Sequence, residues 1–111
     1  MRKSHKLYIE DMLDAISKIQ DYAKGLSYKS FAKNALVCDA VIRNLEIIGE
    51  AAKTVPEEVK TLHPEIEWRK IAGLRDVLIH EYSGVDLRIV WDVVANKLPG
   101  LKSSIEPLLK E

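Results

Sequence analysis

The segment from Ser30 to Thr54 constrains the fold more than any other part of the chain, because it predicts a helix that is apolar on nearly all sides. Apolar residues recur in it every three or four positions, the spacing of helical packing faces. They form three stripes: Phe31, Ala35, Cys38, Ile42, Leu45, Gly49 and Ala52; Val37, Val41, Ile48, Ala51 and Val55; and Leu36, Ala40 and Ile47. Charged residues occupy an arc of only roughly 80°. Such a helix needs neighbours on several sides.

A second copy of the chain is the simplest partner that could cover part of this apolar surface. In a lone helical bundle of 111 residues, much of this surface would face water. We therefore expect a homodimer. Gly49 lies in the middle of the segment, where glycine costs about 1 kcal/mol relative to alanine, so it predicts a close approach of another backbone. Along the charged arc, Arg43, Glu46, Glu50 and Lys53 are expected to form solvated ion pairs.

The first half of the chain contains two further helical signals. Apolar residues at helical spacing predict a helix from His5 to Lys24, and Gly25 is placed to end it. Pro56 and the two acidic residues after it begin a short helical turn, which His63 and Pro64 end. This turn should connect two pairs of longer helices.

The second half continues in the same way. A helix is expected to open near Trp68, and Asp86 is a suitable N-cap for the next helix. Pro99 and Gly100 should interrupt that helix before a last helical segment, whose apolar residues are Leu101, Ile105, Leu108 and Leu109. Strand-like alternation is not evident. We predict an all-α fold, an antiparallel up-and-down four-helix bundle with a short extra helix, forming one domain over residues 1–111.

Composition limits the classes of function. Seventeen basic and seventeen acidic residues cancel, so any nucleic-acid site must be a local patch. The single cysteine, Cys38, falls among apolar residues and predicts a buried thiol in a reducing compartment. No run of eighteen apolar residues occurs, so we expect a soluble, cytoplasmic protein without a membrane partner. His5 and His63 lack metal-ligand spacing with His80, and we expect neither a metal nor a cofactor.

The stretch from Arg75 to Tyr82 carries the most chemistry. Arginine offers a permanently charged fork that matches phosphate oxygens, and histidine exchanges a proton near neutral pH. If the Trp68 helix runs through Ile79, His80 lies in its last turn on the same face as Asp76, whereas Arg75 and His80 diverge by roughly 140°. The helix macrodipole and the Asp76 carboxylate would both favour the imidazolium. A helix cap without catalytic function is the structural alternative.

Three segments together resemble the HepT-like toxin family of the HEPN superfamily, and the resemblance covers nearly the whole chain. They are RNLEIIGEAAK from Arg43 to Lys53, WRKIAGLRDVLIHEYSGVD from Trp68 to Asp86, and VWDVVANKLPGL from Val90 to Leu101. The most specific feature is an arginine, four intervening residues, a histidine, one residue and a tyrosine, placed at the end of the third bundle helix.

This resemblance implies a dimeric, metal-independent endoribonuclease with both copies of the motif in a cleft between protomers. It also implies a toxin of a type VII-like pair, encoded beside a nucleotidyltransferase antitoxin of the MntA type. By position, Arg75 and His80 match the catalytic pair. Tyr82 matches the tyrosine that the partner modifies with AMP, and Asp76 stands where many relatives have asparagine. An aspartate there would weaken RNA binding unless it pairs with Arg75 or His80.

Several residues near the motif allow more than one interpretation. Arg69, Lys70 and Arg88 could form an RNA-facing patch. Trp68 and Trp91 lie on predicted packing faces, which favours core filling over base stacking. The competing hypothesis for the whole protein is a non-catalytic helical adaptor, which binds a nucleotidyltransferase or presents its substrate.

Overall fold

Helices account for nearly all of the part of the chain that the computed structural model describes, residues 4–80 and 86–111. Neither range contains a strand, which confirms the predicted all-α class. The elements in chain order are α1 (His5–Ala23), α2 (Tyr28–Ala32), α3 (Ala35–Thr54), α4 (Glu57–Leu62), α5 (Trp68–His80), α6 (Leu87–Asp92), the π-helical turn η2 (Val93–Lys97), α7 (Leu98–Ile105) and the 3-10 turn η3 (Glu106–Lys110).

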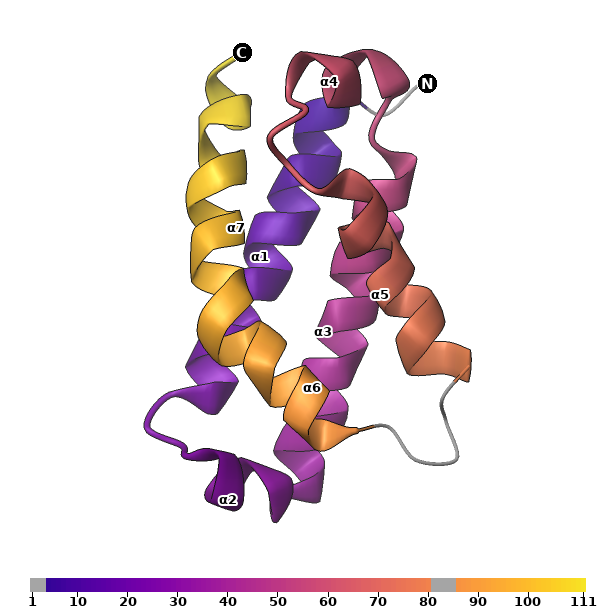
Figure 1. Cartoon of the computed structure of the whole chain (residues 1–111). Helices are drawn as coiled ribbons and strands as arrows, with labels where there is room; N and C mark the ends of the chain where they lie inside the picture. The colour runs from indigo at the N-terminus through magenta and orange to yellow at the C-terminus, as the bar shows by residue number, and fades with distance from the viewer. Residues whose placement is uncertain (1–3, 81–85) are drawn as a thin grey trace.

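Helix α3 is the central element. Its most extensive contacts are with α1 and α5, and α1 also contacts α7 and η3. Figure 1 shows that α1 and α5 run in one direction, whereas α3 and the α6–α7 segment run in the other. Between described residues, α5 makes extensive contacts with α3 alone.

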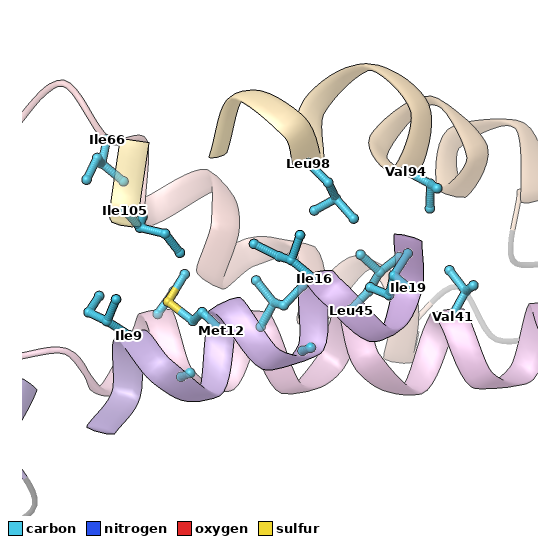
Figure 2. Close-up of a cluster of buried hydrophobic side chains, with 14 of the residues drawn as sticks. Ile9, Met12, Ile16, Ile19, Val41, Leu45, Ile66, Val94, Leu98 and Ile105 are labelled. Carbon is cyan, nitrogen blue, oxygen red and sulfur yellow. The ribbon is translucent and has the colours of Figure 1, made fainter. Parts of the chain in front are cut away.

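The core lies where α1, α3 and the α6–α7 segment meet. Figure 2 shows side chains from these elements gathered in one cluster with Ile66, which lies between α4 and α5. Its labelled members are Ile9, Met12, Ile16, Ile19, Val41, Leu45, Ile66, Val94, Leu98 and Ile105, and all of them are buried. The burial of aliphatic side chains of this size contributes roughly 1.5 to 3 kcal/mol each, so this cluster is the main source of stability.

The first helix ends as predicted. Helix α1 stops at Ala23, and Gly25 adopts a φ of +77°. In that left-handed region a side chain would clash with its own backbone, so glycine is the residue that turns the chain here. The short helix α4 also agrees with its prediction, because Pro56 precedes it and His63 follows it.

The prediction of one helix from Ser30 to Thr54 was wrong, because the chain divides there into α2 and α3. Ser27 and Ser30 form a capping box at the start of α2, with the Ser30 amide donating to the Ser27 hydroxyl at 3.2 Å. Asn34 then caps α3, its side-chain oxygen accepting from the Val37 amide at 3.0 Å. A side chain that satisfies a free amide favours a new helix start over continuation.

A single chain covers most of the apolar surface of α3. The buried members are Cys38, Val41, Leu45, Ile48, Gly49, Ala51 and Ala52, whereas Val37, Ala40, Ile42 and Ile47 are half-buried. Leu36 differs from them, with 81% of its surface exposed. Helices α1 and α5 thus cover much of the apolar surface that suggested a dimer. The homodimer stays a prediction.

The predicted interruption at Pro99 was also wrong, because the helical path continues through it. The Leu98 amide donates to the Val93 carbonyl, the five-residue hydrogen bond of a π-turn. Pro99 has no amide hydrogen to donate to the carbonyl four residues earlier. The wider turn just before the proline therefore keeps the helix continuous, and α7 follows it directly. None of the helices in the described ranges combines the length and apolarity needed to cross a membrane.

Candidate functional site

Helix α5 carries the motif, and its first turn is held firmly. Trp68 is buried, and its indole N–H donates to the His63 carbonyl at 3.0 Å. This confirms the packing role predicted for Trp68. The helix then extends to His80, as the sequence predicted. Asp76 is exposed on it.

The catalytic candidates Arg75 and His80 both belong to α5. They are five positions apart in the sequence, which corresponds to about 7.5 Å along the helix axis and about 140° around it. Within one chain they are therefore not stacked on one helical face. Tyr82 lies outside the described residues, so its role stays a prediction.

Two of the candidates for RNA contact lie at the other end of α5. Arg69 and Lys70 are both exposed, and the Lys70 ammonium is 2.7 Å from the Glu67 carboxylate. Lys70 lowers the pKa of Glu67, and Glu67 raises the pKa of Lys70. Lys70 is ten residues, or about 15 Å of helix, before His80. Part of its charge is thus already balanced within the chain.

Arg88, the third candidate for RNA contact, lies on α6. Asp86 caps this helix as predicted, accepting from the Arg88 amide at 2.9 Å. The guanidinium of Arg88 lies 5.9 Å from the centre of the Tyr28 ring, a distance at which a cation is attracted to an aromatic face. This contact gives Arg88 a structural role that connects α6 to α2.

A polar hollow of about 400 Å³ lies on the side of α3 that carries charged residues. Tyr8 and Asp11 of α1 line it together with Arg43, Glu46 and Glu50 of α3. The sequence placed the α3 residues in one arc but gave no sign that α1 would supply the opposite wall. Such a hollow depends on how two helices pack.

The structure also reveals an interaction that the sequence analysis missed. His63 Nε2 lies 2.7 Å from a carboxylate oxygen of Glu111, and its Nδ1 lies 3.5 Å from Glu65. The hydrogen bond to Glu111 is the main reason that the pKa of His63 is raised. Glu111 is 48 residues away in the sequence, so no local pattern could have indicated this pair.

Two other predictions concern cysteine and metal ligands. Cys38 is buried, as predicted, and its thiol donates to the Phe31 carbonyl at 3.1 Å. Burial, followed by the nearby Asp39 charge, raises the pKa of this thiol. Among the described residues, no group of three or more His, Cys, Asp or Glu side chains is arranged to hold a metal ion.

Comparison with known proteins identifies the family of this chain. The model of the HepT-like family, described as ribonuclease HepT-like, matches residues 12–108, a range that includes all of α5. The chain belongs to the HepT-like ribonuclease family. The family resemblance inferred from the three sequence segments is thereby confirmed.

Individual relatives of this HepT-like chain agree with the family match. It is 46% identical to a Thermococcus cleftensis protein named probable ribonuclease HepT, over 99% of this chain and 100% of that protein. It is 38% identical to a Caldanaerobacter subterraneus subsp. tengcongensis protein provisionally named an RNase, over 98% of this chain and 97% of that protein. No solved structure matches this chain significantly.

Proposed function

We propose that this HepT-like protein is the toxin of a type VII-like toxin–antitoxin pair and cleaves RNA without a metal ion. Membership of a ribonuclease family is the observation that carries the proposal. The placement of Arg75, Asp76 and His80 on the single helix α5 agrees with it. The fold is proposed to be one domain, an up-and-down four-helix bundle that works as a homodimer.

The proposed reaction uses the two motif residues for different tasks. His80 removes the proton from a ribose 2′-hydroxyl, and that oxygen attacks the adjacent phosphorus. Arg75 stabilises the negative charge that gathers on the phosphorane. The bond to the 5′-oxygen then breaks, and that oxygen takes a proton. The products are a 2′,3′-cyclic phosphate and a 5′-hydroxyl.

A second copy of the chain would supply the acid. Arg75 and His80 are about 140° apart around the axis of α5. Two copies of the motif that face each other could therefore bring an arginine and a histidine to the same phosphate more easily than one copy. One histidine then acts as base and the other protonates the leaving oxygen. Monomers should be inactive. Cleavage per chain should therefore rise with concentration in step with dimer formation measured by sedimentation.

The central test is cleavage of total RNA in excess chelator. The wild type should cleave, whereas Arg75→Ala and His80→Ala should each lose about 10²- to 10⁴-fold in rate. Lys24→Ala, at an exposed lysine beyond the end of α1, is the control and should keep full activity. Cleavage by His80→Ala at the wild-type rate would contradict the proposed base. A wild type that does not cleave but binds a nucleotidyltransferase tightly would support the adaptor hypothesis.

We further propose that an MntA-type nucleotidyltransferase silences the toxin by attaching AMP to Tyr82. The added group brings bulk and negative charge into a site built for phosphate. Mass spectrometry after reaction with ATP and that partner should find AMP on the wild type and none on Tyr82→Phe. Tyr22→Phe is the matched control, because Tyr22 is 40% exposed and should not be needed for modification. Equal labelling of Tyr82→Phe would contradict this assignment.

A further inference from the structure

A cleft opens along the seam between α5 and the η2–α7 segment. Its volume is about 490 Å³, within the range of pockets that hold small organic ligands. Most of its wall is apolar, formed by Ile48, Ile66, Ile71, Leu74, Val93, Leu98 and Leu101. The cleft follows from the packing of α5, whose extensive contacts with described residues are with α3 only.

Some of the charged residues that line this cleft are in ion pairs, and one is not. Glu67 lies 2.7 Å from Lys70, and Glu65 lies 3.5 Å from His63. Lys97 also lines the cleft, and among the ion pairs between described residues none includes it. Lys97 acts on Glu67 only as a minor influence after Lys70. Lys97 is therefore a cation beside an apolar cleft, and it is not in an ion pair with any described residue.

The π-turn that accommodates Pro99 also forms part of this cleft. Val93 and Lys97 are the first and last residues of the π-turn η2, and both line the cleft. Single π-turns inside helices lie frequently at functional sites. Here the irregular turn is part of the cleft wall and carries its available cation.

We propose that the cleft binds a small amphiphilic anion, namely an unbranched monocarboxylate with its alkyl chain between α5 and α7 and its carboxylate at Lys97. The volume favours a slim chain over a docked helix. Two turns of helix with a diameter of about 10 Å fill about 850 Å³, well above the volume of the cleft. The proposal is independent of ribonuclease activity.

Titration calorimetry of the full chain with decanoate, kept below its aggregation concentration, tests the proposal. We expect saturable binding of one decanoate per chain. Lys97→Met should weaken it at least about fivefold, and decyltrimethylammonium, with the same chain and opposite charge, should bind at least about fivefold more weakly than decanoate. Lys29→Met, on α2 and away from the cleft, should bind like the wild type.

A matched pair of serines tests the location. Ser104 lines the cleft, whereas Ser103 does not, and each hydroxyl donates to the carbonyl four residues earlier in the same helix. Ser104→Leu should fill the cleft and lower decanoate affinity about tenfold or more, whereas Ser103→Leu should leave it unchanged. If Ser104→Leu also lowers the melting temperature, the location is tested instead by comparing the decanoate affinities of Lys97→Met and Lys29→Met.

Three results would overturn the proposal. They are a lack of saturable decanoate binding, equal binding of decyltrimethylammonium, or equal effects of Ser103→Leu and Ser104→Leu. Sedimentation provides the last check. Dissociation of a dimer in proportion to decanoate binding would assign the cleft to a second copy of the chain instead.

Discussion

At the scale of single residues, His63 shows how one side chain can connect distant parts of the chain. Its ring lies between Glu65 and Glu111, and its carbonyl accepts the hydrogen bond of Trp68 at the start of α5. It thereby joins the connector before the motif helix to the last residue of the sequence. The same imidazole should make the stability of the protein depend on pH.

The pKa of His63 is raised in the folded protein, chiefly by its hydrogen bond to Glu111. The stabilisation is therefore complete below the ordinary histidine pKa of about 6.5 and is lost as the pH rises through the higher folded value. We expect His63→Gln to lower the melting temperature more at about pH 5.5 than at about pH 8.5. Glu57→Gln, exposed on α4, is the control. An equal loss at both pH values would contradict this account.

At the scale of elements, caps and prolines decide where these helices begin and end. Gly25, Pro56 and Asp86 act locally, so the sequence predicted their positions correctly. Asn34 and Pro99 were misjudged. Asparagine can lie within a helix or cap one, and proline can end a helix or be accommodated by a wider turn.

The cap at Asn34 gives a prediction at this scale. Asn34→Ala leaves the Val37 amide without its 3.0 Å acceptor, so it should lower the free energy of unfolding by about 1 kcal/mol. Asn34→Asp keeps an acceptor and should be close to the wild type. Chemical denaturation measures both, and Lys33→Ala at the neighbouring exposed position is the control. A loss no greater than that of Lys33→Ala would show that the cap contributes little.

At the scale of the whole molecule, α3 is central because its apolar sides are divided between α1 and α5. Two leucines on this helix differ most in their surroundings. Leu45 is 0% exposed and Leu36 is 81% exposed in the single chain. This contrast makes them a matched pair for separating the core from a surface that a second copy would cover.

Leu45→Ala should lower the free energy of unfolding by about 2 to 5 kcal/mol, because it removes contacts and leaves a cavity. Leu36→Ala should change it by less than about 0.5 kcal/mol if that surface faces water. Denaturation at two protein concentrations measures both effects. A large, concentration-dependent loss in Leu36→Ala would instead indicate that a dimer covers Leu36.

The helical class, most helix ends, the buried Cys38 and the location of Arg75 and His80 on one helix could all be predicted from the sequence, because spacing and caps act over a few residues. Only the tertiary structure brought His63 to Glu111, built the hollow between α1 and α3 and left the cleft beside α5. Those features join residues far apart in the chain. They depend on how helices pack, and helical periodicity says which face is apolar but not which neighbour covers it.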